Sequence, residues 1–423
     1  MRVLRIYHSG RSNGHRARER ALTALGIDVV LVVPRNWTES GAERDLSNET
    51  FEIVELPVLR PDDVNRHVYA DADALAKLIQ RVGPDVVDIH EEPYSAVSHQ
   101  VLDLVPRGTP VSMYSAQNVD KRYPPPFSRY ERAAFSRARA VYPCSRLAAS
   151  VVRGRGFQGL IDVLPLGFDA SLFCPGAQRH DDSPFVVSLV GRLVPEKGIR
   201  DALSAFRELV QVRSARMVIA GSGPLDKQVD ECIRAFGLEK HVDRQPWLSP
   251  EGVAALYRRS HITLVPSLAT NRIVEQYGRM VVEAQASGAV VIGYATGALP
   301  EVAGGAAVLL AQGDRRGLAG ALVAVAGDDA SWRRLRERGF SAAESKAWTN
   351  VAAKQAGIYE ACLSMSSRAW TGTMRSYAKA EFGPTAKLAS GVRRPFALPV
   401  LRDLPALSRT CDRLVALTQS SSS

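Results

Sequence analysis

Several features that mark other classes of protein are missing from this 423-residue sequence. No apolar run approaches the roughly 18 residues that span a bilayer, and the N-terminal stretch lacks the apolar core of an export signal. Cysteine is scarce, and its spacing indicates neither disulfides nor a zinc site. The five cysteines are Cys144, Cys174, Cys232, Cys362 and Cys411. We therefore expect a cytoplasmic protein with reduced thiols.

Motifs for cofactors and metals are also missing. Gly10 and Gly14 in the stretch SGRSNGH fit neither the dinucleotide-binding pattern nor the phosphate-binding P-loop. The stretch HEEP lacks the second histidine of a zinc protease helix, and Pro93 interrupts any helix there. The acids of DADA, residues 71–74, lie in a helical pattern and favour a solvated surface. We expect neither a metal ion nor a cofactor.

Positive charge is abundant. The net charge is +10, which favours an anionic partner: nucleic acid, an acidic membrane face or a phosphorylated small molecule. The basic residues are spread along the chain without a nucleic-acid-binding module, so we do not expect nucleic acid. Residues 366–423 form a basic extension, which is either a solvated tail or a peripheral contact with the inner face of an acidic membrane.

Short apolar runs alternate with amphipathic helical patterns along most of the chain. This alternation predicts parallel sheets with helices on both faces. Proline, glycine and charge interrupt it around residues 163–184, so we expect two doubly wound, Rossmann-like α/β domains, over residues 1–172 and 183–340. A helix over residues 341–365 is expected to pack back on the first domain. Ligands of such sheets bind beyond the carboxyl ends of the strands, which places the site in a cleft between facing domains.

Basic residues follow the first strand of the second domain, in GRLVPEKG at residues 191–198. Arg192 and Lys197 converge at the strand's carboxyl end, where a guanidinium and an ammonium suit a diphosphate. The alternative is that both are ordinary surface cations. In IAGSGP, residues 219–224, glycines allow the backbone to approach a ligand closely.

Two glutamates, Glu275 and Glu283, stand eight positions apart in EQYGRMVVEAQASG. Gly278 and the polar residues before it predict a helix that starts near Tyr277, with Glu275 in the preceding loop and Glu283 inside the helix. The pair would then hold two ends of one elongated ligand. Taken alone, the two carboxylates are more typical of a solvated surface helix, and only the surrounding motifs favour a ligand.

These stretches, in this order, resemble the donor-binding domain of retaining glycosyltransferases of family 4, glycosyl transferases group 1, which have the GT-B fold. The resemblance covers residues of about 160 to 315 and includes GFDASLFCP before the linker. It implies a metal-independent transfer of a hexose-type sugar from a UDP- or GDP-sugar to a hydroxyl acceptor. The acceptor would belong to polysaccharide, glycolipid or natural-product biosynthesis and would be a saccharide, a lipid-linked molecule or a small molecule.

The resemblance also assigns roles in donor binding. Arg192 and Lys197 would stabilise the departing phosphate, Glu275 would hold donor-sugar hydroxyls, and Glu283 would accept hydrogen bonds from the ribose. The remaining donor-site residues are backbone positions near the phosphates and sugar: Gly14, Gly191, Gly221, Gly223, Tyr277, Gly278 and Met280. Trp247 in RQPWLS either stacks on the base or packs against the protein, because Pro246 stands where the family usually has glycine.

The first domain is expected to bind the acceptor. His90 ends the strand PDVVDIH and resembles the family histidine that lies beside the transferred sugar; the alternative is a structural histidine. Glu92, Gln117 and Asn118 are candidates for acceptor binding, although Glu91 and Glu92 also fit solvated acids. Other functions remain open at this point: a GT-B sugar-nucleotide epimerase, a phosphorylase, or a protein that binds sugar nucleotides without catalysis.

Overall fold

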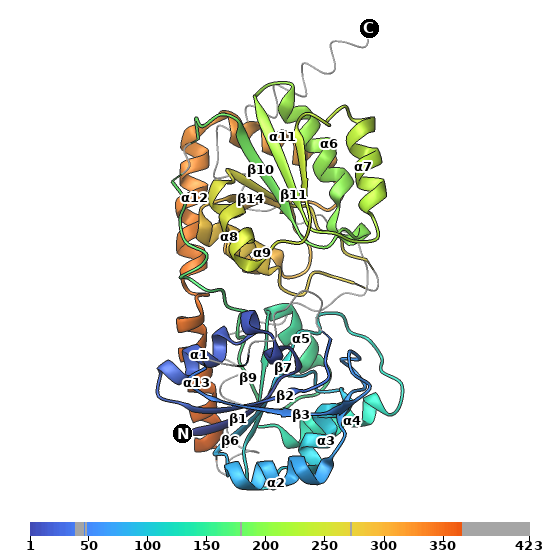
Figure 1. The fold of residues 1–423 in the computed structure, drawn as a ribbon, viewed down its shortest axis with the longest axis vertical. Coiled ribbons are helices and arrows are strands. Elements are labelled where there is room, and N and C mark those ends of the chain that lie inside the picture. The colour runs from blue at the N-terminus through green and yellow to red at the C-terminus, as the bar shows by residue number, and fades with distance from the viewer. Residues whose placement is uncertain (39–45, 47–48, 178–179, 271–272, 366–423) are drawn as a thin grey trace. The chain divides into compact units, whose positions relative to one another are not determined.

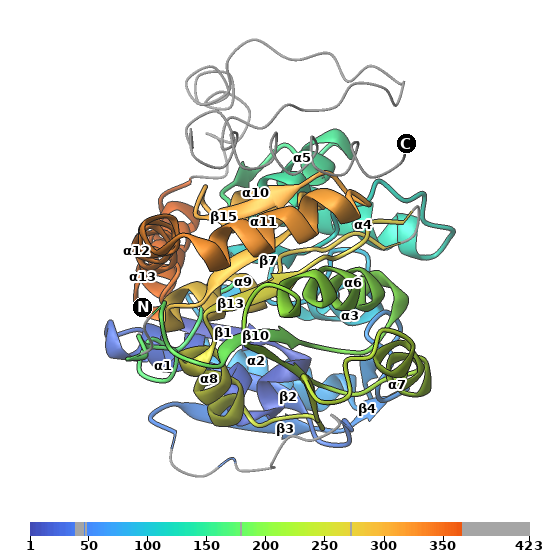
Figure 2. The ribbon, with the colours of Figure 1, turned by 90° about the horizontal axis from the view of Figure 1, so that it is seen from above.

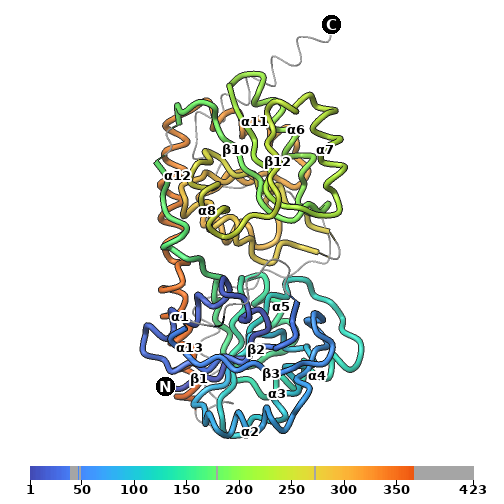
Figure 3. The backbone as a smooth tube through the Cα atoms, viewed as in Figure 1, coloured from blue at the N-terminus to red at the C-terminus, as the bar shows by residue number. Residues whose placement is uncertain are grey.

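The computed structural model describes residues 1–38, 46, 49–177, 180–270 and 273–365. The chain divides into two compact units, and each is described by itself. Unit 1 contains Met1–Gly167 and the returning segment from Lys346, whereas unit 2 contains Phe168–Ser345. The chain thus enters unit 2 once and comes back, as the tube in Figure 3 shows. The basic extension predicted over residues 366–423 lies outside the described residues.

Unit 1 is built on a seven-stranded parallel sheet with the order β3-β2-β1-β6-β7-β8-β9. The order reverses between β1 and β6, which makes this the topological switch point of the sheet. The strands are β1 (Arg2–Ile6), β2 (Asp28–Pro34), β3 (Glu52–Leu56), β6 (Val86–Ile89), β7 (Val111–Ser115), β8 (Ala140–Pro143) and β9 (Leu160–Ile161). A separate antiparallel pair joins β4 (Val58–Leu59) to β5 (Val68–Tyr69).

Helices cover both faces of this sheet (Figures 1 and 2). Three of them start at a side chain that accepts a hydrogen bond from the first turn: Asp71 caps α2, Ser95 caps α3 and Ser145 caps α5. The helices of unit 1 are η1 (His8–Arg11), η2 (Asn13–His15), α1 (Ala17–Ala24), α2 (Ala72–Val82), α3 (Ala96–Leu104), α4 (Phe127–Arg137), α5 (Arg146–Gly154) and α13 (Trp348–Ser364).

The side-chain alternation along β1 divides the core of unit 1 into two faces. Leu4 and Ile6 pack with the cluster that includes α2 and α3, whereas Val3 packs on the other side with Leu22 of α1 and Tyr359 of α13. The helix α13, from the C-terminal end of the described chain, therefore completes one face of the first sheet.

Unit 2 contains a six-stranded parallel sheet with the order β12-β11-β10-β13-β14-β15. Its switch point lies between β10 and β13. The strands are β10 (Phe185–Val190), β11 (Ala215–Ala220), β12 (Val242–Gln245), β13 (Ile262–Val265), β14 (Val290–Tyr294) and β15 (Ala307–Leu310). The prediction of two doubly wound α/β domains is confirmed.

The helices of unit 2 connect these strands. Ser249 accepts a hydrogen bond from the Gly252 amide and precedes Pro250, which gives the helix α8 a capped start. The helices are η3 (Pro195–Lys197), α6 (Ile199–Val210), α7 (Asp226–Ala235), α8 (Pro250–Arg259), α9 (Arg279–Ser287), α10 (Leu299–Val302), α11 (Arg315–Gly327) and α12 (Asp329–Glu344).

Some element boundaries differ from the sequence prediction. The apolar stretch that begins at Val3 forms a strand only as far as Ile6, because His8–Arg11 form a turn of 3-10 helix. The single helix predicted over 341–365 is the end of α12 followed by α13, with Ala347 between them and extended. Within the described ranges, no helix combines the length and apolar character needed to cross a bilayer.

Candidate functional site

The predicted donor-site residues of unit 2 gather at the carboxyl edge of its sheet. Loops follow β10, β11 and β13, which are parallel neighbours, so the three loops leave the sheet at the same edge. The first carries Arg192 and Lys197, the second Gly221 and Gly223, and the third Glu275. The topology therefore brings together residues that are up to 84 positions apart, from Gly191 to Glu275.

Two glycines let the first two loops touch. Gly191 has φ +141° and Gly221 has φ +137°, in a region that L side chains rarely adopt. A Cβ on Gly221 would lie 2.0 Å from the carbonyl oxygen of Gly191. Gly223 is similarly close to the backbone of Leu193. Any larger residue at Gly221 would push the two loops apart.

Lys197 and Glu275 form an ion pair at this edge. The Nζ of Lys197 lies 2.7 Å from Oε2 of Glu275, and Ser267 donates to the same oxygen over 3.3 Å. Both side chains are about one-fifth exposed, at 22% and 18%. The ammonium is therefore oriented by protein groups while part of it still faces solvent.

Arg192 lies on the same loop and is exposed. Among the described residues, none forms a hydrogen bond or an ion pair with its side chain. Its guanidinium therefore keeps its full capacity to bind an anion through paired N–H groups.

The paired glutamates lie as the sequence predicts. Gly278 has φ +87° and precedes α9, so Glu275 stands in the loop before the helix and Glu283 within it. A Cβ on Gly278 would come within 3.6 Å of both Glu275 and Met280, and within 2.4 Å of Leu299. Tyr277 is buried just before the helix.

Glu283 is more enclosed than Glu275. Its side chain is 13% exposed and lies 3.4 Å from Arg279, one turn earlier on α9. Burial raises the pKa of the Glu283 carboxyl, and the neighbouring Arg279 opposes that shift. A buried carboxylate with one cation nearby retains lone pairs for hydroxyl donors.

Trp247 projects from the loop between β12 and α8. It is 60% exposed, so the interpretation that it packs against the protein is wrong. An exposed indole in a loop at the carboxyl end of a strand offers a flat apolar face to a ligand ring.

The predicted residues of unit 1 surround the switch point between β1 and β6. His90 follows β6 and is buried, with Tyr7 and Tyr114 against its ring at centroid distances of 4.4 and 4.1 Å. Its Nδ1 lies 3.1 Å from the Tyr142 hydroxyl and 3.3 Å from Nη1 of Arg18. Burial, with Arg18 and Arg5 nearby, holds the pKa of His90 well below its usual value, so the imidazole is neutral.

The two acids after His90 are not solvated, and that interpretation is wrong. Glu91 is buried and accepts hydrogen bonds from the backbone N–H of His8 over 2.7 Å. Glu92 accepts hydrogen bonds from the Ala116 amide and the Ser115 hydroxyl, over 2.8 and 2.9 Å. Desolvation raises the pKa of Glu92 to about 7.

The other predicted residues of unit 1 differ in burial. Gln117 and Asn118 are buried in the loop after β7, close to the strand that ends at Ser115. Gly14 lies in η2, and a Cβ there would meet no atom within 4 Å, so its position does not require glycine.

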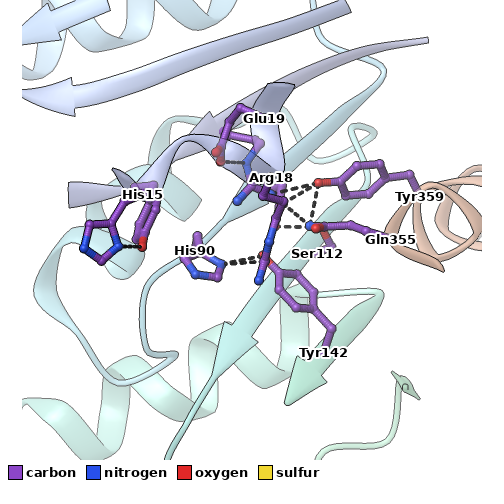
Figure 4. Close-up of polar contacts among 11 residues, drawn as sticks. His15, Arg18, Glu19, His90, Ser112, Tyr142, Gln355 and Tyr359 are labelled. Atoms are coloured by element: carbon purple, nitrogen blue, oxygen red, sulfur yellow. Dashed lines mark hydrogen bonds and ion pairs between the residues drawn. The ribbon is translucent and has the colours of Figure 1, made fainter. Parts of the chain in front are cut away.

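The sequence analysis missed a group of buried polar side chains beneath His90, shown in Figure 4. Asp88 of β6 and Arg5 of β1 are register partners, both fully buried and in an ion pair. Arg5 also bonds Glu19 of α1 over 2.7 Å. The available signal was a charged residue in the middle of two short strands, in VLRIY and VVDIH, where both faces of the sheet are covered.

No group of three or more histidine, cysteine, aspartate or glutamate side chains that could share a metal ion occurs in the part of the chain that the structure describes. The described cysteines Cys144, Cys174, Cys232 and Cys362 are free thiols.

Two family models match the chain, one on each unit. The model described as Glycosyltransferase Family 4 matches residues 19–172, and the model described as Glycosyl transferases group 1 matches residues 175–341. Together they cover both doubly wound sheets.

Curated relatives align over part of the chain. MMP alpha-(1->4)-mannosyltransferase of Mycolicibacterium hassiacum is 30% identical over 208 residues, which are 47% of this chain and 48% of that protein. D-inositol 3-phosphate glycosyltransferase of Corynebacterium glutamicum is 32% identical over 218 residues, 47% of this chain and 51% of the relative. The chain spans about half the length of the curated relatives it matches.

Solved structures share the fold along more of the chain. A sucrose-phosphate synthase from Thermosynechococcus elongatus matches with a TM-score of 0.67 at 17% identity, covering 86% of this chain and 100% of that one. Anabaena HepE in complex with UDP and glucose matches with a TM-score of 0.63 at 16% identity, covering 85% and 100%. With its two sheets and the two matching family models, the chain belongs to the family 4 glycosyltransferases, the glycosyl transferases group 1 with the GT-B fold.

Proposed function

We propose that the protein is a retaining, metal-independent glycosyltransferase that moves a hexose-type sugar from a UDP- or GDP-sugar to a hydroxyl acceptor. The observation that carries the proposal is the oriented Lys197–Glu275 ion pair, with Arg192 on the same loop and without a side-chain partner among the described residues. The neighbour HepE binds UDP and glucose, which supports a nucleotide sugar as the donor.

The cations have the chemistry that this reaction needs. Cleavage of the bond between the sugar carbon and the phosphate oxygen leaves negative charge on the diphosphate. Arg192 and Lys197 would stabilise that charge in the place of a metal ion, and each is expected to contribute on the order of 3 kcal/mol to the transition state. The site is organised before the donor arrives, because Glu275 and Ser267 already orient the Lys197 ammonium.

The acids would hold the neutral parts of the donor. Glu275 lies beside Gly278, at the start of α9, and would accept hydrogen bonds from sugar hydroxyls. Glu283, one turn into α9, would accept them from the ribose. Backbone groups near Tyr277, Gly278 and Met280 would complete the contact with the phosphates at the start of this helix.

Retention needs no protein nucleophile in this scheme. The acceptor oxygen forms its bond to the sugar carbon on the face from which the diphosphate leaves, and the departing phosphate oxygen takes the acceptor's proton. The protein's contribution is then to position the reactants and stabilise charge. In unit 1, we assign His90 to the transferred sugar, and Glu92, Gln117 and Asn118 to the acceptor, a saccharide, a lipid-linked molecule or a small molecule.

The test starts with a panel of nucleotide sugars screened for binding. The best donor is then incubated with cell extract, and the anomeric configuration of the product is read by NMR. Arg192→Ala and Glu275→Gln, still folded, should each transfer sugar about a hundredfold more slowly. Arg216→Ala, which removes an exposed arginine from β11 in the same unit, is the matched control and should be as fast as the parent.

Other outcomes would replace the proposal. Conversion of the donor without any acceptor indicates an epimerase, a requirement for free phosphate indicates a phosphorylase, and binding without turnover indicates a non-catalytic protein. Full activity in the Arg192 and Glu275 variants would end the assignment of the site.

Location is part of the same proposal. We place the protein in the cytoplasm, with a peripheral contact between its net positive charge of +10 and an acidic membrane. Sedimentation with liposomes should then increase with the fraction of anionic lipid. Sedimentation that does not depend on anionic lipid would remove the membrane contact and leave the catalytic assignment intact.

A further inference from the structure

The Asp88 carboxylate accepts hydrogen bonds from side chains on four elements of unit 1. Its Oδ2 accepts hydrogen bonds from Arg5 of β1 and from Gln355 and Tyr359 of α13. Its Oδ1 accepts from Ser112 of β7 over 3.2 Å and from Tyr142 of β8 over 2.5 Å. The side chain is fully buried and forms an ion pair with Arg5. Figure 4 shows Gln355 and Tyr359 pointing from α13 toward this group.

This arrangement determines what Tyr142 can do for His90. The hydroxyl of Tyr142 carries a single hydrogen, and it donates that hydrogen to Oδ1 of Asp88. The Tyr142 oxygen is then left with lone pairs for its other neighbours. The Nδ1 of His90, 3.1 Å away, can bond this oxygen only by donating a hydrogen.

Arg18 competes for the same ring nitrogen. Its Nη1 lies 3.3 Å from Nδ1 of His90 and is a donor, so a bond between them requires Nδ1 without hydrogen. The Arg18 guanidinium has other support, because it lies over the Trp348 ring at 5.0 Å from the centroid. The contact to Tyr142 is the shorter one, and the hydroxyl hydrogen of Tyr142 is already used on Asp88, so the tautomer in which Nδ1 carries the hydrogen is favoured.

We propose that Tyr142 is a positioning residue for His90: it accepts a hydrogen bond from Nδ1 and so leaves Nε2 as the acceptor that faces a substrate hydroxyl. Both hydrogen bonds of the His90 ring use Nδ1, and none of the described residues bonds Nε2. His90 keeps 6% of its surface exposed, so the residue is not completely closed off from solvent. Gln355 and Tyr359 support the arrangement from α13 by satisfying the other oxygen of Asp88.

This proposal deepens the function proposed above, since the hydroxyl belongs to the transferred sugar or the acceptor. Its central measurement does not depend on activity. The imidazole nitrogens are labelled with ¹⁵N in all eight histidines, and the His90 signals are identified by their loss in His90→Gln. The shifts and proton couplings of the two nitrogens show which one carries the hydrogen. At pH 8 we expect Nδ1 in the parent protein.

Three variants separate a specific role from general damage. Tyr142→Phe removes the accepting oxygen, so Arg18 should donate to Nδ1 and the hydrogen should move to Nε2. Arg18→Met removes the competing donor and should leave the hydrogen on Nδ1. Tyr359→Phe removes the hydroxyl that donates to Oδ2 of the same carboxylate without contacting His90, and should leave the tautomer unchanged.

The proposal is overturned if the parent carries the hydrogen on Nε2, or if Tyr142→Phe leaves it on Nδ1. It is also overturned if Tyr359→Phe moves the hydrogen as Tyr142→Phe does. The tautomer would then depend on all the side chains around Asp88, and not on Tyr142 in particular. In a sugar-transfer assay, Tyr142→Phe should lower kcat roughly tenfold, the equivalent of one hydrogen bond of about 1.4 kcal/mol. If no donor is transferred by the parent protein, the proposed function fails while the tautomer result still stands.

Discussion

The two units place charged groups very differently in sheets of similar topology. In unit 2, Lys197 and Glu275 are partly exposed, and Arg192 is exposed with no side-chain partner among the described residues. In unit 1, Arg5 and Asp88 are fully buried and paired with protein groups, although Nη2 of Arg5 finds no partner in the described part of the chain. The same topology thus serves two purposes. The edge of unit 2 keeps charge available for a ligand, whereas unit 1 uses its charge to hold a neutral histidine in place.

The largest effect is expected from breaking the buried group in unit 1. Asp88→Asn keeps the shape of the side chain but removes one of the two buried carboxylates that pair with Arg5 and leaves only Glu19, which should destabilise the protein by about 3 to 5 kcal/mol. The measurement is the midpoint of thermal or urea unfolding. As a control, Asp329→Asn breaks the exposed pair with Arg333 on α12 and should change stability by less than about 0.5 kcal/mol. Equal changes in the unfolding midpoint for both variants would show that the buried pair of unit 1 contributes no more to stability than an exposed pair.

Breaking the ion pair of unit 2 should lower the rate of sugar transfer and have little effect on the stability of the fold. Lys197→Met removes the oriented ammonium, so the sugar-transfer rate should fall about a hundredfold, or about 3 kcal/mol. Because the pair is partly exposed, stability should change by no more than about 1 kcal/mol. Steady-state kinetics and an unfolding curve on the same preparation test both statements. A folded Lys197→Met protein with the parent's rate would show that the ammonium is not used.

Unit 1 should also respond to pH through Glu92. Its pKa is raised to about 7 in the folded protein, so between the ordinary value near 4.5 and pH 7 the folded state binds the proton more tightly than the unfolded state. The stability from this group is therefore fully present at low pH and is lost as pH rises toward 7, by on the order of 2 to 3 kcal/mol.

Unfolding curves between pH 5 and pH 8 measure this loss. Glu92→Gln cannot ionise, so its stability should fall less over the same range than that of the parent. Parallel pH profiles for the two proteins would show that Glu92 titrates normally.

The smallest expected effect concerns Trp247, at the periphery of unit 2. Trp247→Ala should leave stability within about 0.5 kcal/mol, because 60% of the side chain is exposed. If the indole stacks on the nucleobase, as we expect, UDP or GDP should bind about tenfold more weakly, or about 1.4 kcal/mol. Calorimetric titration with each nucleotide measures this, with Leu147→Ala, an exposed apolar side chain in unit 1, as the control. Unchanged affinity for both nucleotides would place the base elsewhere.

The site of unit 2 could be predicted largely from the sequence because its residues lie in short, local patterns. Gly191, Arg192 and Lys197 follow one strand, and Gly278 marks the start of the helix that carries Glu283. Each pattern specifies its own loop, and the parallel sheet brings the loops to one edge. The sequence did not show that Lys197 and Glu275 pair directly, because their contact joins separate loops.

Unit 1 was harder to predict because its important contacts have no local signature. Glu91 was interpreted as solvated, although it is buried against His8, on a loop that follows a different strand. Arg5 and Asp88 are charged residues within apolar strands, but no residue close to either of them in the sequence indicates which side chain it pairs with.

The sequence by itself determined the two doubly wound domains and the loops that carry Arg192, Lys197, Glu275 and Glu283. Hydrophobic periodicity and glycine placement are local properties, and they suffice for elements that form within a few turns of chain. The sequence also predicted that the last helix packs on the first domain, but only the tertiary structure decided that Tyr359 of α13 and Asp88, 271 positions apart, share a hydrogen bond. Such a contact depends on which buried faces meet, because a buried charge must find its donors wherever packing brings them.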